Sequence, residues 1–105
     1  YNIVNNVFYG TGAGGTKGVH VNLTTWAADA TLANNIFWNW DVGLQSTSAN
    51  IGVCANNMFH QVTSGSEATT TTCSGSLIKN PLFANTNIMS PHGFKLRPGS
   101  PAIDR

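Results

Sequence analysis

Charged side chains are scarce in this chain: Asp, Glu, Lys and Arg make up only 9% of its 105 residues, and the formal net charge is +1. An average soluble protein has about 25% charged residues. So little charge excludes a coiled coil, a basic nucleic-acid-binding domain and an acidic solvated tail. The chain also lacks an apolar run near the ~18 residues that a membrane-spanning helix needs, so no membrane span is expected.

Cysteine is scarce as well, since the chain has only Cys54 and Cys73. A structural zinc site would need His at short spacing, which His60 alone does not supply, and the C-x-x-C redox motif is absent. We favour one disulfide in an exported protein, which would stabilise the fold by about 3 kcal/mol. The alternative is two unpaired thiols, with Cys54 serving as a small core residue.

What the chain does contain is an internal repeat. Four segments align without gaps: 3–8 (IVNNVF), 32–37 (LANNIF), 54–59 (CANNMF) and 78–83 (IKNPLF). Each has an apolar first residue, Asn in the third position and Phe in the sixth, and the third-position Asn recurs at intervals of 29, 22 and 24 residues. This regularity is too high for chance, even in a chain rich in Asn.

The composition of these repeats favours strands over helices. β-Branched and aromatic residues fill the repeat cores, the connections are rich in Gly, Thr and Ser, and no window keeps an apolar stripe at helical spacing. Strands are predicted at 18–22, 42–46, 50–54 and 76–78. Short strands joined by loops of irregular length predict an all-β parallel β-helix of about three to four coils.

In such a solenoid, equivalent residues of successive coils lie above one another at ~4.8 Å spacing. The repeat then predicts an interior aromatic stack, an aliphatic stack beside it, and a corner of Asn residues whose amides bond one another. These columns are Phe8, Phe37, Phe59 and Phe83; Ile3, Leu32, Cys54 and Ile78; and Asn5, Asn34, Asn56 and Asn80. A structural role for the Asn residues is favoured over ligand binding, and Pro81 indicates that coil winding ends nearby.

The repeat resembles right-handed parallel β-helix proteins of the pectate-lyase-like superfamily. The segments 80–85 (NPLFAN) and 93–104 (GFKLRPGSPAID) resemble the end of that helix in exported bacterial members, where such a sequence closes the last coil. The resemblance implies one domain over 1–105, with coils in 1–90 and a closing segment in 91–105. It implies a carbohydrate-active protein, chiefly a polysaccharide lyase or glycoside hydrolase. The alternative is a non-catalytic structural or adhesive surface module, because the superfamily also includes such proteins.

The start of the chain adds an expectation about its context. Tyr1 stands immediately before the first repeat, and residues 1–6 have neither the charged start nor the apolar stretch of a signal peptide. We therefore expect the carboxy-terminal part of a longer secreted or cell-surface solenoid, whose preceding coils stack on this end. The alternative is a second chain that stacks there by strand addition.

The sequence assigns no catalytic residues. A glycosidase needs two carboxylates about 5 to 9.5 Å apart, but no two acidic residues share a column of the repeat. A lyase needs a base and a cation; Lys95 and Arg97 alternate on one face of the closing segment, but a solvated edge explains them more simply. No acidic cluster suits calcium, so no metal or cofactor is expected unless a part outside this chain supplies it.

The position after each Phe is the best candidate for ligand contact. If Phe points inward, strand alternation points Tyr9, Trp38 and His60 outward, one per coil, with Trp40 in the adjacent loop. Aromatic rings pack on the apolar faces of sugars, so our hypothesis is a saccharide-contacting face with polysaccharide as partner. The alternative is that loops such as 10–17 cover these rings as a second small core.

Two further patterns carry less weight. Asn22-Leu23-Thr24 is an N-glycosylation sequon, usable only in a eukaryotic secretory pathway, and arises easily by chance in this composition. The Thr run 69–72 resembles an ice-binding surface only in composition, because its residues are consecutive instead of recurring at the coil period.

Overall fold

The structure is a computed structural model that describes residues 1–10, 17–21, 30–46, 52–62, 67–68, 73–87, 89–90 and 92–103. The regular elements among these residues are short β-strands. In chain order they are β1 (Asn2–Val4), β2 (Val7–Tyr9), β3 (Lys17–Val21), β4 (Thr31–Ala33), β5 (Ile36–Trp38), β6 (Val42–Ser46), β7 (Val53–Ala55), β8 (Met58–His60), β9 (Glu67–Ala68) and β10 (Leu77–Ile78). The predicted sequon at Asn22 and the Thr run 69–72 lie outside the described residues.

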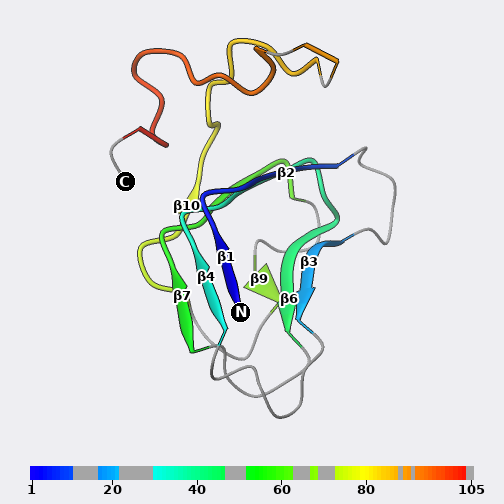
Figure 1. The fold of residues 1–105 in the computed structure, drawn as a ribbon, viewed down its shortest axis with the longest axis vertical. Helices are drawn as coiled ribbons and strands as arrows, with labels where there is room; N and C mark the ends of the chain where they lie inside the picture. The colour runs from blue at the N-terminus through cyan, green and yellow to red at the C-terminus, as the bar shows by residue number, and fades with distance from the viewer. Residues whose placement is uncertain are drawn as a thin grey trace.

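The strands form three parallel sheets, which Figure 1 shows around a shared interior. The first has the order β1-β4-β7, the second β10-β8-β5-β2 and the third β3-β6-β9. A strand thus pairs with its counterpart one repeat later, as β1 does with β4, and not with the next strand in sequence. The described part of the protein is therefore all-β with parallel sheets.

The pairing register follows the first three segments of the sequence repeat. Ile3 pairs with Leu32, and Leu32 pairs with Cys54. In the second sheet Phe37 pairs with Phe8 on one side and with Phe59 on the other. Equal positions of the three segments therefore lie in successive layers, about 4.8 Å apart.

The interior between the sheets is a core of stacked rings and aliphatic side chains. The ring centroids of Phe8 and Phe37 are 5.0 Å apart and those of Phe37 and Phe59 are 5.2 Å apart, with interplanar angles of 9° and 8°. Phe37 is completely buried. Leu32 of β4 and Leu44 of β6 belong to the same cluster, so side chains from all three sheets meet there.

Two consecutive Asn residues form the corner between the first and second sheets. Asn5, Asn34 and Asn56 have φ of 59°, 57° and 54°, in the left-handed region that Asn tolerates better than most residues. This change of backbone direction leaves the first Asn exposed and buries the second, as at Asn35 and Asn57. The sequence predicted stacked amides on the first Asn of each pair, but the structure has them on the second.

The predicted fourth repeat is wrong in register. Ile78 pairs with Phe59 and not with Cys54, while Ser74 bridges to Ala55. The fourth layer is therefore 73–78, which has neither the Asn pair nor the Phe of the earlier layers. Its corner is made by glycine.

Gly75 makes that corner, with φ of 64°, because glycine enters the left-handed region without steric cost. Asn80, predicted as the fourth corner, instead accepts the Leu82 N–H on its side-chain oxygen at 2.8 Å. Phe83, predicted as the fourth interior ring, belongs to a separate apolar cluster outside the sheets. Among the described residues the interior ring stack therefore has three members.

The strand bounds predicted from the sequence agree with the observed strands to different degrees. The predicted strand 42–46 coincides with β6, and 18–22 is shifted by one residue relative to β3. The predicted strand 50–54 is displaced, since β7 begins at Val53, which pairs with Thr31. β10 is the last strand of the sheets among the described residues and ends at Ile78. The described residues of the segment 81–103, all but 88 and 91, then fold back over the second sheet.

The predicted disulfide between Cys54 and Cys73 is present, with the two Cα atoms 4.5 Å apart. Both half-cystines are buried in the interior cluster. The bridge joins the third layer to the fourth, the layer that lacks the Asn pair and the Phe.

We expect the double substitution of Cys54 and Cys73 by Ala to lower the free energy of unfolding by about 3 kcal/mol, because the unfolded chain gains loop entropy. Urea denaturation followed by circular dichroism measures the loss. Reduction of the wild-type protein should give a similar loss, and reduction should not change the double variant. A double variant as stable as the oxidised protein would contradict this expectation.

Candidate functional site

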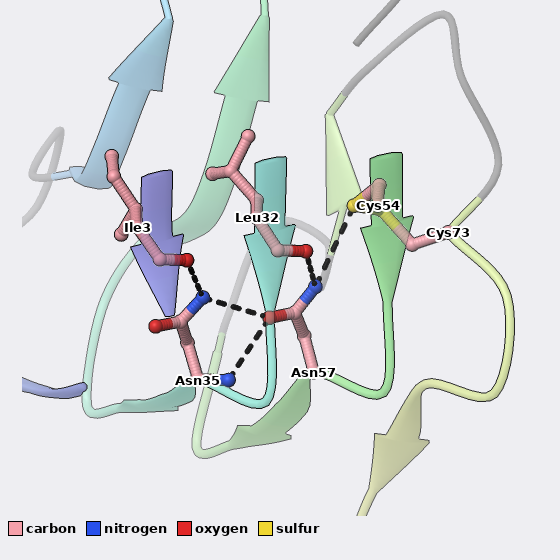
Figure 2. Close-up of a disulfide and its surroundings, with 6 residues drawn as sticks. All are labelled: Ile3, Leu32, Asn35, Cys54, Asn57 and Cys73. Atoms are coloured by element: carbon pink, nitrogen blue, oxygen red, sulfur yellow. Dashed lines mark hydrogen bonds between the residues drawn. A yellow bond between two sulfur atoms is a disulfide. The ribbon is translucent and has the colours of Figure 1, made fainter. Parts of the chain in front are cut away.

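Buried side-chain amides form a ladder along the Asn corner (Figure 2). The Asn35 Nδ2 donates to the Ile3 carbonyl at 2.9 Å and to the Asn57 Oδ1 at 3.1 Å. The Asn57 Nδ2 donates to the Leu32 carbonyl at 3.1 Å and contacts the Cys54 sulfur at 3.5 Å. Each amide therefore joins its own layer to the layer before it.

Backbone N–H groups complete the ladder. The N–H of Asn6 donates to the Asn35 Oδ1, and the N–H of Asn35 donates to the Asn57 Oδ1, each at 3.1 Å. Asn35 and Asn57 are 0% and 1% exposed, so water cannot replace these partners. Because Asn35 and Asn57 are held in place, the positions of the exposed residues before them, Asn34 and Asn56, are fixed as well.

In the fourth layer Ser76 stands at the position equivalent to Asn57, because it follows the glycine corner as Asn57 follows Asn56. The amide ladder therefore stops at Asn57. The Ser76 Oγ is buried and has no hydrogen-bond partner in the described part of the chain. We expect Ser76→Asn to raise the free energy of unfolding by about 1 kcal/mol, because the new side-chain oxygen can accept the Asn57 N–H.

Urea denaturation measures this gain, and Ser74→Asn, an exposed position of the same layer, is the matched control. The control substitution should change stability by less than about 0.5 kcal/mol. A loss of stability at position 76, or an equal gain at position 74, would contradict an extendable ladder.

Three of the predicted ligand-contacting side chains lie together on the outer face of the second sheet. The ring centroids of Tyr9 and Trp38 are 5.6 Å apart, and those of Trp38 and His60 are 5.4 Å apart. This column follows from the pairing of β2, β5 and β8. Its fourth position is Lys79, which follows β10.

The segment 81–103 covers part of this column. Phe83 stacks on Trp38 with centroids 5.3 Å apart and an interplanar angle of 15°, and Phe94 contacts Tyr9 at 5.3 Å. The indole N–H of Trp38 donates to the Gln61 side chain. One face of the Trp38 ring and its only polar atom are therefore already engaged.

Trp40, also predicted to contact ligand, lies apart from this column. Its indole N–H donates to the Phe8 carbonyl at 2.9 Å, and its ring packs against the interior cluster. A Cβ atom at Gly10 would collide with the Trp40 ring and with the Asn39 carbonyl. Trp40 therefore supports the corner after β5.

A cleft of about 260 Å³ lies between the second sheet and the segment 81–103. Its floor is an apolar column of Val7, Ile36 and Met58, which pair with one another in successive strands. The opposite wall includes Phe83 and Leu96, which are joined by an antiparallel bridge. This volume lies just below the range of small-molecule sites, about 300–1,000 Å³, so the cleft suits a small group such as one sugar unit.

Amides form one rim of the cleft. Asn5, Asn34 and Asn56 line it and are exposed, one per layer. Their backbone N–H groups bond to carbonyls of the following layers. None of the hydrogen bonds among the described residues uses their side-chain amides, so these donors and acceptors are available to a ligand.

Hydrogen bonds hold the outer wall in shape. The N–H of Ala84 donates to the Lys95 carbonyl at 2.7 Å, and the N–H of Arg97 donates to the Leu82 carbonyl at 3.0 Å. The buried Ser100 hydroxyl donates to the Pro81 carbonyl. These hydrogen bonds therefore hold the cleft-facing residues of this segment in place.

None of the described residues that line the cleft is ionisable. Burial lowers the pKa of His60, in the outward column, below its ordinary value. Among the described residues no three His, Cys, Asp or Glu side chains lie together as a metal site, and no helix is long and apolar enough to cross a membrane.

The fifth position of the sequence repeat is a signal for the cleft. The fifth position of each repeat is apolar, with Val7, Ile36 and Met58, although it lies on the same side of the strand as the outward ring column. An apolar column on an outer face requires a cover. Phe94, which belongs to that cover, carries no periodic signal.

Comparison of the chain with protein families, curated proteins and solved structures gave no match.

Proposed function

We propose that this chain is a right-handed parallel β-helix of the pectate-lyase-like type, and that it serves an exported protein that binds or degrades polysaccharide. The cleft beside the Asn corner is its saccharide site. Three parallel sheets in layered register support the fold, and the disulfide between Cys54 and Cys73 fits an oxidising compartment.

The observation that carries the saccharide site is the row of exposed amides beside an apolar floor. Asn5, Asn34 and Asn56 offer hydrogen-bond donors and acceptors at the ~4.8 Å layer spacing. Sugars present hydroxyl groups around an apolar ring face, so they match a site with amides on one side and aliphatic or aromatic carbon on the others.

In this proposal catalysis would belong to other coils, because none of the described residues that line the cleft is ionisable. A polysaccharide lyase or glycoside hydrolase would carry its acid, base or cation there. Those coils, or a second chain, would add strands beyond β1, β2 and β3, each of which has a neighbour on one side only among the described strands.

The test replaces Asn34 by Gly, which keeps the left-handed backbone and removes the amide. Affinity for a bound oligosaccharide should fall about five- to tenfold, the effect of losing about one hydrogen bond. Isothermal titration calorimetry against a panel of plant and bacterial cell-wall oligosaccharides measures it.

Asn39→Gly is the matched control, because Asn39 also has positive φ, at 62°, and follows the next strand, β5, without lining the cleft. It should leave affinity within about twofold of wild type. Equal losses in the two variants would argue against the Asn rim, and a panel without any binder would argue against the saccharide function.

A non-catalytic structural or adhesive module is the second candidate. The covering of Trp38 by Phe83 favours it, since that ring then serves packing. Incubation of the full-length protein with polysaccharides separates the two: ultraviolet-absorbing unsaturated ends or new reducing ends indicate an enzyme, and neither product across a broad panel indicates a module.

A further inference from the structure

We propose that the cleft selects an uncharged sugar unit that carries a methyl group, namely a 6-deoxyhexose or an O-acetylated sugar. This inference rests on the proposed saccharide function and specifies which class of sugar the cleft accepts. It comes from the combination of an apolar floor, an apolar wall and an amide rim without charge.

The absence of ionisable side chains among the described lining residues disfavours acidic sugars. A carboxylate that enters the cleft loses water and gains at most amide donors from the rim. The nearby cations do not compensate for this loss. Lys95 and Arg97 are exposed and do not line the cleft, and the Arg97 guanidinium donates to the Ala84 carbonyl at 3.5 Å.

The floor and the wall favour a methyl group. Ile36 and Met58 are 8% and 3% exposed beneath the wall, whereas Val7 is 40% exposed, so the floor opens to solvent at Val7. A ligand group that reaches past Val7 meets only apolar side chains on the floor, namely Ile36 and Met58. A methyl group fits there, whereas a hydroxymethyl group would lose its hydrogen bonds to water.

The amide rim supplies the polar half of the recognition. With the methyl group on the floor, the ring hydroxyls of the same sugar face Asn5 and Asn34, whose side-chain amides are exposed. Amides donate and accept, so they bind hydroxyl groups without requiring charge. The site therefore recognises a sugar with one apolar and one hydroxylated edge.

Pairs of free sugars that differ in one group test the proposal by calorimetry and by NMR titration of the Asn side-chain amides. L-Fucose against L-galactose compares methyl with hydroxymethyl, and acetylated against unacetylated xylobiose tests the O-acetyl source. D-Galacturonate against D-galactose tests charge. The methyl-bearing member should bind about tenfold tighter in at least one of the first two pairs, and galacturonate at least about tenfold weaker than galactose.

Val7→Thr, which replaces a floor methyl by a hydroxyl of the same shape, should reduce the methyl preference below about threefold. Val4→Thr is the matched control, because Val4 is 39% exposed and does not line the cleft. Equal or tighter binding of the hydroxymethyl and acidic sugars overturns this inference while the saccharide function stands. Failure of every sugar to bind overturns both, and an unchanged preference in Val7→Thr overturns the floor assignment.

Discussion

Replacing Phe37 by Ala should lower the free energy of unfolding by about 3–5 kcal/mol. Phe37 is the middle ring of the interior stack, completely buried between Phe8 and Phe59. Its removal leaves a cavity that rigid strand pairing on both sides cannot close. Total stabilities of single domains are about 5–15 kcal/mol, so this variant lies close to unfolding, and urea denaturation measures the loss.

A double-mutant cycle with milder changes keeps the prediction testable if Phe37→Ala does not fold. Phe37→Leu and Phe59→Leu should couple by about 0.5 kcal/mol or more, because their rings touch. Phe37→Leu and Phe83→Leu should add within about 0.5 kcal/mol, because Phe83 packs in the outer cluster. Additivity of Phe37→Leu with Phe59→Leu, or coupling of Phe37→Leu with Phe83→Leu, would contradict this arrangement of the rings.

Replacing Asn35 by Asp is expected to have the second large effect, a loss of about 3 kcal/mol or more at neutral pH. The Asn35 Nδ2 donates to the Ile3 carbonyl and to the Asn57 side chain. A carboxylate at this position is buried, has no hydrogen to donate and faces two oxygen acceptors. Chemical denaturation at neutral pH measures the loss.

Asn34→Asp is the matched control for this prediction. The residue is the immediate neighbour, is exposed, and has a φ of 57° that Asp also tolerates. Its substitution should change stability by less than about 0.5 kcal/mol. Losses of similar size at positions 34 and 35 would mean that the ladder does not depend on the buried amide.

The sequence predicted the layered part of the structure because that part repeats. Apolar, Asn and Phe positions recur in the first three segments, and parallel strand pairing converts such recurrence directly into spatial columns. The disulfide followed from the presence of two Cys in a chain with export-like composition. The left-handed corners at Asn5, Asn34 and Asn56 followed from the tolerance of Asn for positive φ.

The sequence did not predict features in which another residue type occupies an equivalent position of the repeat. Gly75 replaces the corner Asn of the fourth layer, so the Asn pattern predicted the fourth segment at 78–83 instead of 73–78. The assignment of the ladder to Asn35 depends on how the corner turns the chain, which composition does not encode. Phe83 covers Trp38 although the two residues lie far apart in the sequence, and the repeat does not predict a contact of this kind.

The most direct test of the account is an NMR measurement of the hydrogen bond between the Asn35 backbone N–H and the Asn57 Oδ1, which are 3.1 Å apart. This bond requires the layer register, the buried second Asn and the corner geometry that places the cleft rim. We predict a through-hydrogen-bond coupling between the Asn35 backbone nitrogen and the Asn57 side-chain carbonyl carbon, together with slow exchange of the Asn35 amide. No coupling and rapid exchange in the folded protein would contradict the account.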